Sequence, residues 1–211
     1  MSEKKDQEKL VDPKDILFSM PTIEDALPGI VESSTSDVAV LEIHEDDWRQ
    51  LEFISRDQLE NITKEMEQIQ QIFDNEAVEI KIEVEAVPLL AFKEIHLRQL
   101  IPRPISNPFT FNKLSEYFNA DMTRGTLKFH DYSGVVKNAF YIKIEGLEYY
   151  GQTDDDKIVV FCLYNADSRE DLKNSIMKLT NLLNSEDLLL VDWMRRRVIS
   201  NKEELEKYFQ I

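Results

Sequence analysis

The sequence contains very little cysteine and glycine. Cys162 is the only cysteine among 211 residues, so no disulfide can form within the chain, and its place inside an apolar run is typical of a buried hydrophobe in a reducing compartment. Only five glycines are present, and none belongs to a loop of the kind that holds nucleotide phosphates. A Gly-x-Ser-x-Gly elbow is also missing. These absences disfavour nucleotide chemistry and nucleophilic chemistry.

Long apolar runs and positive charge are scarce as well. No stretch approaches the ~20 apolar residues that a membrane span needs, and the charged N-terminal residues are followed by no apolar signal segment. We therefore expect a cytoplasmic protein without membrane contact. The 25 basic residues are outnumbered by 41 acidic ones, which gives a net charge of -16. Such a surface repels phosphates, so nonspecific nucleic-acid binding is disfavoured.

The segment 139–193 carries the strongest structural signals. Residues 139–150 alternate apolar and polar side chains, a polar turn is expected at 151–156, and an apolar run follows at 158–164. A helix then places Leu172, Ile176, Leu179 and Leu183 on one face, and residues 188–191 form a buried strand, expected beside the 158–164 strand. This β-β-α-β unit predicts an α+β fold with a mixed, mainly antiparallel sheet and packed helices.

The elements before and after this unit fit the same class. Ser55 is a good N-cap for a helix with one apolar stripe. Residues 78–84 alternate apolar and charged side chains, as in a strand with one buried and one solvent-exposed face. Further strands are expected at 92–101 and 126–129, a short helix at 112–118, and a final helix from about residue 201. The helical stripe after Ser55 consists of Leu59, Ile62, Met66, Ile69 and Phe73.

Residues 1–36 are expected to form a flexible tail before a single domain at 37–211. Prolines at 13, 21 and 28 interrupt every helix that this segment could form, and a run of serine and threonine ends it. The tail nevertheless contains apolar islands that could dock, either on this chain's own domain or on another protein. The docking residues would be Ile16, Leu17, Phe18 and Met20.

Acidic residues are concentrated between positions 42 and 85, a segment that contains 14 acidic residues and only four basic ones. A field of this sign would steer a basic protein partner and speed its association, although the acids could also serve solubility alone. The basic run Arg195-Arg196-Arg197 could pair with the acidic helix after Ser55 or with an acidic partner. The candidate partner-binding residues are Glu42, Glu45, Asp46, Asp47, Asp57, Glu60 and Glu67.

Two groups of residues bear a weak likeness to metal sites. His44 with Asp46 and Asp47 offers ligands for a divalent cation, but all three come from one short loop, and a solvated acidic turn is the alternative. Asp74, Glu79 and Lys81 have the residue types of a metal-dependent nuclease, yet strand alternation already explains the last two. We therefore assign no metal, no cofactor and no catalytic residue.

The sequence thus favours a non-catalytic acidic protein that binds another protein with a basic surface. An inhibitor, or an immunity protein that neutralises a toxin, would have these properties. Two alternatives stay open at this stage. One is a scaffold subunit of a multiprotein assembly, tethered by its N-terminal tail. The other is a hydrolase that depends on a divalent metal.

Overall fold

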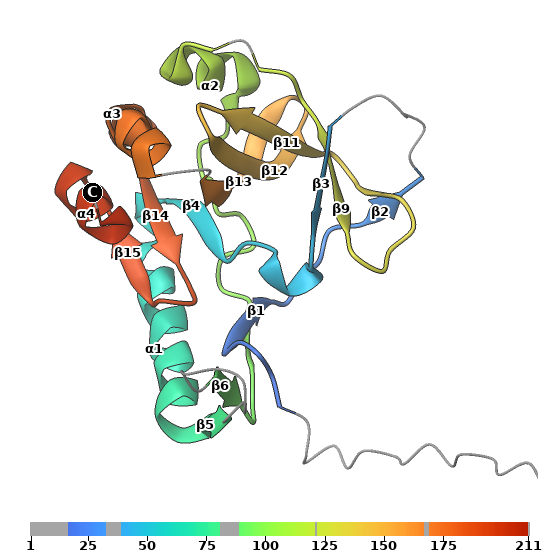
Figure 1. Cartoon of the computed structure of the whole chain (residues 1–211), viewed down its shortest axis with the longest axis vertical. Helices are drawn as coiled ribbons and strands as arrows, with labels where there is room; N and C mark the ends of the chain where they lie inside the picture. Colours follow the sequence, from blue (N-terminus) through green and yellow to red (C-terminus); the bar gives the residue numbers. More distant parts are fainter. Residues whose placement is uncertain (1–16, 33–38, 81–88, 121, 167–168, 211) are drawn as a thin grey trace, which may run out of the picture.

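The computed structural model of this chain describes residues 17–32, 39–80, 89–120, 122–166 and 169–210 (Figure 1). Within these ranges it has four α-helices and 15 strands in mixed, mostly antiparallel sheets, which confirms the α+β class. The helices are α1 (Leu59–Glu76), α2 (Phe111–Phe118), α3 (Arg169–Ser185) and α4 (Lys202–Phe209), with short 3-10 turns η2 (Glu45–Asp47) and η3 (Arg56–Gln58).

The main sheet has the strand order β11-β12-β13-β4-β14-β15, and every neighbouring pair in it is antiparallel. Its strands are β4 (Leu51–Ser55), β11 (Ala139–Ile144), β12 (Leu147–Asp154), β13 (Lys157–Ala166), β14 (Leu188–Asp192) and β15 (Arg197–Ile199). A short strand, β8 (Phe109–Thr110), also pairs with β13.

The other strands form small two-stranded sheets. The pairs β1-β7 and β3-β9 are parallel, whereas β2-β10 and β5-β6 are antiparallel. Their bounds are β1 (Thr22–Glu24), β2 (Ile30–Val31), β3 (Val40–Ile43), β5 (Ala77–Ile80), β6 (Leu89–Phe92), β7 (His96–Arg98), β9 (Thr126–Phe129) and β10 (Val135–Val136).

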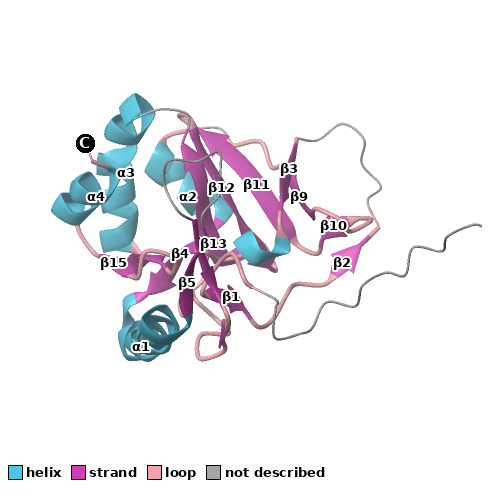
Figure 2. Cartoon of the chain, turned by 60° about the horizontal axis from the view of Figure 1, so that its bottom comes forward, coloured by secondary structure: helices cyan, strands magenta, loops and turns pink. Residues whose placement is uncertain are grey.

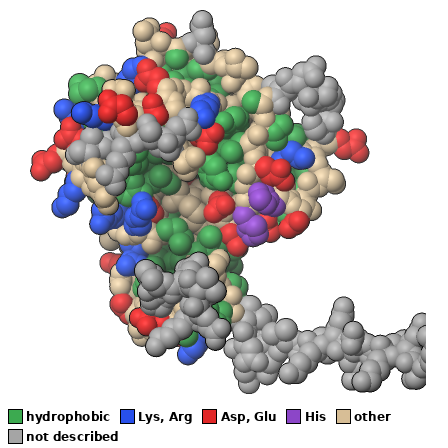
Figure 3. All heavy atoms as spheres, in the orientation of Figure 1, with side chains coloured by type: hydrophobic (Ala, Val, Ile, Leu, Met, Phe, Trp, Pro, Cys, Tyr) green, Lys and Arg blue, Asp and Glu red, His purple; other side chains and the backbone are tan. Residues whose placement is uncertain are grey.

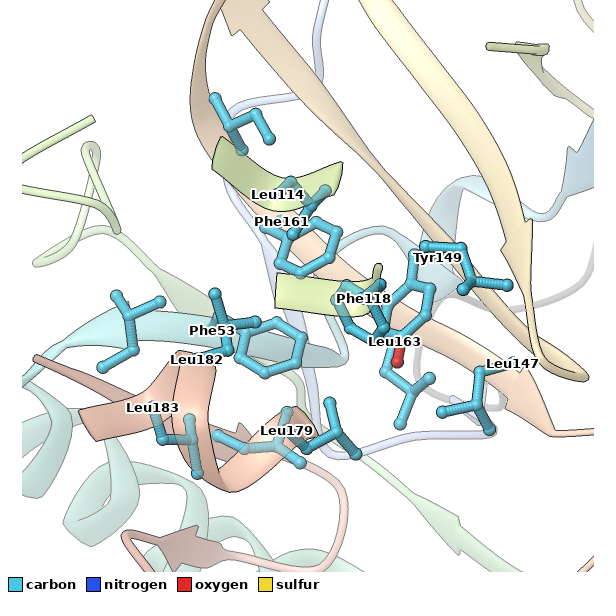
Figure 4. Close-up of a cluster of buried hydrophobic side chains, with 14 of the residues drawn as sticks. Phe53, Leu114, Phe118, Leu147, Tyr149, Phe161, Leu163, Leu179, Leu182 and Leu183 are labelled. Atoms are coloured by element: carbon cyan, nitrogen blue, oxygen red, sulfur yellow. The ribbon is translucent and has the colours of Figure 1, made fainter. Parts of the chain in front are cut away.

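Both faces of the main sheet are covered. On one face α2, α3 and α4 enclose the largest apolar cluster, in which the rings of Phe53, Tyr149 and Phe161 stack at the centre (Figure 4). On the opposite face α1 packs over β4 and β14, and the β3-β9 pair packs over β12 and β13. Figure 2 shows α1 on the side of the sheet away from α3 and α4. The sheet is therefore a buried middle layer.

The expected strand at 139–150 is in fact a hairpin, so the prediction of one strand was wrong. The chain reverses at Glu145 and Gly146, both of which have positive φ angles (50° and 78°), and Gly146 supplies this conformation without strain. The expected turn at 151–156 also begins too early, because the second reversal is confined to Asp155 and Asp156. A tight two-residue turn barely interrupts the alternation, so periodicity alone did not reveal it.

The position of the buried strand at 188–191 also differs from expectation. As predicted, every residue of β14 is buried, but the strand lies beside β4 and not beside β13. Strand β4 separates the two, with Glu52 in register with Cys162 on one side and Phe53 in register with Leu190 on the other. A strand covered on both faces, as β4 is, belongs in the centre of a sheet.

The described part of the predicted tail packs on this chain's own domain. Phe18 exchanges two backbone hydrogen bonds with Phe92 (2.8 and 2.9 Å), and β1 and β2 pair with β7 and β10. The packed structure thus begins upstream of the expected boundary at residue 37, because backbone groups in this segment find strand partners. Ile16 and the remaining parts of the tail, 1–15 and 33–36, lie outside the described residues.

Several boundaries differ in detail. The expected strand at 92–101 is divided between β6 and β7, and residues 81–84 of the expected strand at 78–84 lie outside the described residues. Ser55 does not cap α1; its hydroxyl accepts a hydrogen bond from the Ser106 amide (2.9 Å), and η3 precedes the helix. Asn201 caps α4 by accepting a hydrogen bond from the Glu204 amide (3.0 Å).

The close approach of β12 to its neighbours can be tested at Gly151. A Cβ atom at this position would overlap the carbonyl oxygen of Val160 and lie 2.8 Å from the ring of Phe140. We expect Gly151→Ala to reduce the free energy of unfolding by about 1–3 kcal/mol, because the core has no room for the methyl group.

Gly29→Ala is the matched control, because a Cβ there meets no atom within 4 Å. Its effect on the free energy of unfolding should stay within about 1 kcal/mol. Urea denaturation of both variants measures the difference. Equal stabilities would contradict the tight packing of β12 against β13.

Candidate partner-binding site

Four charged side chains form a buried ion network beneath β1. Glu52 on the central strand β4 is completely buried, and Arg49 Nε donates to its Oε2 at 2.7 Å. Arg49 Nη1 lies 3.0 Å from Glu24 Oε1 on β1, and Arg98 Nε on β7 lies 3.8 Å from Glu24 Oε2. The network therefore joins three separate segments of the chain.

Neutral groups complete this network. The indole of Trp193 donates to Glu52 Oε1 at 2.7 Å, and Arg49 Nη2 donates to the carbonyl of Ile101 at 3.0 Å. Arg98 donates to the carbonyl of Arg49 at 3.1 Å and lies over the Trp193 ring. Because each carboxylate has a cationic partner, the burial of four charges is compensated.

Burial also sets the protonation of these groups. It raises the pKa of Glu24 to about 7, although the nearby Arg49 guanidinium acts in the opposite direction. Burial lowers the pKa of Arg98 to about 10, so this side chain still carries its charge at neutral pH. Burial, and then the Glu52 carboxylate, raise the pKa of the Cys162 thiol well above its ordinary value, so the thiol stays protonated. These groups link β1, β4 and β7 beneath the surface of the domain.

The β1-β7 ribbon presents its other face to solvent. Glu24 and Arg98 are paired in register and point inward. Half-buried Ile23 and exposed Leu97, also paired in register, occupy the alternate positions on the outer face. Leu97 is 40% exposed, and Leu100, just beyond β7, is 46% exposed. The ribbon thus carries an apolar outer surface.

Acidic residues flank this ribbon. The turn η2, with half-buried Glu45, Asp46 and Asp47, contacts β1, and α1, with exposed Glu60 and Glu67, contacts β7. The ribbon therefore has an acidic element beside each of its two strands. Figure 3 shows two histidines side by side among acidic side chains in the region of η2.

The two remaining predicted residues lie elsewhere. Glu42 is exposed on β3, in register with Lys128 on β9. Asp57 is in η3, where its carboxylate accepts a hydrogen bond from the hydroxyl of Ser106 (2.9 Å). The candidate partner-binding site is thus the β1-β7 ribbon together with the acids of η2 and α1. Of the expected tail-docking residues, Leu17 is exposed and Met20 Sδ lies 3.4 Å from Gln50 Nε2.

Glu65 anchors β7 to α1, a role that sequence reasoning missed. Its Oε1 accepts hydrogen bonds from the amides of Gln99 (2.8 Å) and Leu100 (2.7 Å), and its Oε2 contacts the His96 ring. Burial raises the pKa of Glu65, but these hydrogen bonds outweigh burial and hold the pKa below its ordinary value. The sequence offered one signal of this role, because Glu65 follows Ile62 by three residues and so lies beside the apolar stripe of α1.

The structure places the two groups that bear a weak likeness to metal sites as follows, with His44 Nδ1 3.4 Å from Asp46 Oδ2. His44 Nδ1 accepts a hydrogen bond from the Asp46 amide (3.3 Å), and its ring lies 6.4 Å from that of His130. Asp74 and Glu79 are both exposed, while Lys81 lies outside the described residues. Within the described ranges, no group of three or more histidine, cysteine, aspartate or glutamate side chains is placed to hold a metal ion.

Comparisons with protein-family models, with curated proteins and with solved structures found no match to this chain. Among the described helices, none is both long and apolar enough to cross a membrane. Function must therefore be inferred from the surface and the buried groups of the chain itself. The exposed ribbon between two acidic elements is the surface feature that best fits a binding role.

The contribution of the buried ion network can be measured with Arg49→Met. This change leaves the carboxylates of Glu52 and Glu24 buried with less compensation, so we expect the free energy of unfolding to fall by about 3–5 kcal/mol. The control is Arg56→Met, which removes the exposed ion pair with Asp187 and should cost under about 1 kcal/mol. Denaturant unfolding compares the two, and similar losses would show that the network contributes no more than a surface pair.

Glu65 should make stability depend on pH. Because its folded pKa lies below the ordinary value of 4.5, the contribution of the carboxylate is complete above pH 4.5 and is lost as the pH falls through the folded pKa. Glu65→Gln should therefore cost about 1–2 kcal/mol at neutral pH, and this difference from wild type should shrink in acid. Thermal or urea unfolding between neutral and acidic pH measures it. A constant difference, or an equal one for the exposed control Glu67→Gln, would refute this role.

Proposed function

We propose that this protein is a non-catalytic protein-binding protein that engages a basic partner through the candidate partner-binding site. The supporting observation is the exposed Leu97 and Leu100 with acidic elements on both sides. Apolar side chains at the centre and charged ones at the rim form the usual arrangement of a protein interface. An inhibitor, or an immunity protein that neutralises a basic protein, acts through such a surface.

The charge distribution supports a basic partner. The chain carries a net charge of -16, and the predicted acidic residues of η2 and α1 lie on either side of the ribbon. A field of this sign accelerates the approach of a positively charged protein, and the exposed leucines then provide apolar contacts that slow its release. The acidic residues thus steer the partner at long range, and the leucines lengthen the time for which it stays bound.

The buried network supports this role because it makes the surface rigid. Glu24 and Arg98 fix the inner face of both strands, so the outward positions of Ile23 and Leu97 are held in place before any partner arrives. A preorganised surface loses less conformational entropy on binding. We also propose a cytoplasmic location, because the single cysteine is a buried free thiol that a reducing compartment would preserve.

Affinity capture from extract of the source organism, followed by kinetics with the purified partner, tests the proposal. The charge-reversed variant Asp46→Lys/Glu67→Lys should slow association of a basic partner about tenfold and reduce the salt dependence of its rate. Leu97→Ser should instead increase the dissociation rate and leave the salt dependence unchanged.

Glu116→Lys/Glu170→Lys is the matched control. It makes the same change in net charge at exposed positions on α2 and α3, which cover the opposite face of the main sheet. This variant should retain the kinetics of the wild type. A partner that binds all variants equally, or the absence of any basic partner from the captured proteins, would reject the proposal.

A further inference from the structure

Strand β15 has an open edge in the main sheet. It pairs with β14 through three registered positions, and among the described strands it ends the sheet order. The backbone groups on its other side are therefore available to a further strand. Edges of this kind are the sites at which extended peptides add to a sheet.

A groove runs along this edge. A cavity of about 430 Å³ is lined by the consecutive residues 196–199 and by Glu204, Lys207 and Tyr208 of α4. Consecutive residues of a strand point to alternate faces, so a cavity that contacts all three residues of β15 follows the edge and not one face of the strand. The three residues of α4 share one helical face. The groove is thus bounded by a strand edge on one side and a helix on the other.

The groove is basic although the chain as a whole is acidic. Arg196, Arg197 and Lys207 line it, against one acid, Glu204, whose carboxylate accepts hydrogen bonds from the amide (2.6 Å) and hydroxyl (2.9 Å) of Ser200. These hydrogen bonds hold the pKa of Glu204 below its ordinary value. Figure 3 shows lysine and arginine side chains gathered on the side of the molecule where the β14-β15 hairpin lies in Figure 1.

Arg196 is held in an unusual way at the end of the groove. Its backbone has a positive φ of 53°, and its guanidinium lies over the ring of Phe73 on α1, 3.5 Å from the ring centroid. Its Nη1 atom is buried and makes no hydrogen bond within the described residues. By contrast, Arg195 is already bound to Asp192 and Tyr208. The guanidinium of Arg196 is therefore held against α1, and Arg197 and Lys207 are the cations left to meet a ligand in the groove.

We propose that this groove binds an extended acidic peptide, which adds to the open edge of β15 as a further strand. Backbone hydrogen bonds to residues 197–199 give the peptide its orientation, and carboxylates at alternate positions meet Arg197 and Lys207. The complementarity of charge selects the occupant, since a peptide without acids would not compensate these cations. This site lies on other elements than the candidate partner-binding site and does not depend on its function.

Fluorescence anisotropy with the full chain tests the proposal. The probe is a pool of labelled peptides with the pattern Glu-x-Glu-x-Glu, in which x is Val, Thr or Tyr. We expect saturable binding of this pool and at least about tenfold weaker binding of the same peptides with lysine in place of glutamate. N-methylation of alternate backbone nitrogens, which removes strand hydrogen bonds without changing charge, should also weaken binding about tenfold.

The variant Arg197→Glu/Lys207→Glu should lose at least about tenfold in affinity. Lys202→Glu is the control, because Lys202 is exposed on α4 and does not line the groove, and it should bind like the wild type. Circular dichroism establishes that each variant is folded. In addition, hydrogen exchange should show that the amides of β15 that point away from β14 become protected when the peptide binds.

Several results would overturn the proposal. Equal binding of the N-methylated pool would show that charge alone attracts the peptide, and equal binding by the Arg197→Glu/Lys207→Glu variant would place the peptide elsewhere. No binding up to about 1 mM peptide would exclude the site. Self-association of the wild-type chain in sedimentation, abolished in the same variant and with no peptide bound, would assign the groove to a second copy of the chain.

Discussion

The structure depends on the burial of one carboxylate on the central strand. Glu52 lies between β13 and β14, where water does not reach it, so its charge must be compensated by the protein. Arg49, three residues earlier, and the indole of Trp193 supply that compensation. Arg49 and Arg98 together then bring more positive charge than Glu52 balances, and the carboxyl group of Glu24 on β1 lies against both guanidinium groups. The position of an N-terminal strand is thus decided by a charge requirement in the middle of the sheet.

This requirement also organises the outer surface. Once Glu24 and Arg98 point inward, strand alternation forces Ile23 and Leu97 outward, between the acids of η2 and those of α1. Glu65 adds a second attachment by binding the amides of Gln99 and Leu100 after β7. On the far edge of the same sheet, the basic residues of the β14-β15 hairpin and α4 line a groove of opposite charge. The chain of net charge -16 therefore has two different surfaces, an apolar ribbon flanked by acidic residues and a basic groove.

The sequence predicted those features that depend on local periodicity. The stripe of α1 is confirmed at Ile62 and Ile69, which are fully buried, but Leu59 at its start is 47% exposed. The apolar positions of α3 face the core. The hairpin at Glu145 and Gly146 was missed because a two-residue turn barely disturbs the alternation. The network was missed because Glu24, Glu52 and Arg98 are far apart in sequence, and a charge in a strand shows only that some partner is needed. The acids of η2 and α1 were identified as residues, but no local pattern places them around a ribbon.

The parallel pairing of β1 with β7 has a consequence for the order in which the chain folds. Thr22 and His96 are 74 positions apart, so β1 has no partner strand until β7 has been made. During that interval Glu24 remains hydrated, and the cations that will balance it are still being synthesised or are uncompensated. Docking of β1 therefore cannot precede the synthesis of β7, and β4, whose carboxylate the network balances, gains its neighbours β13 and β14 only after that.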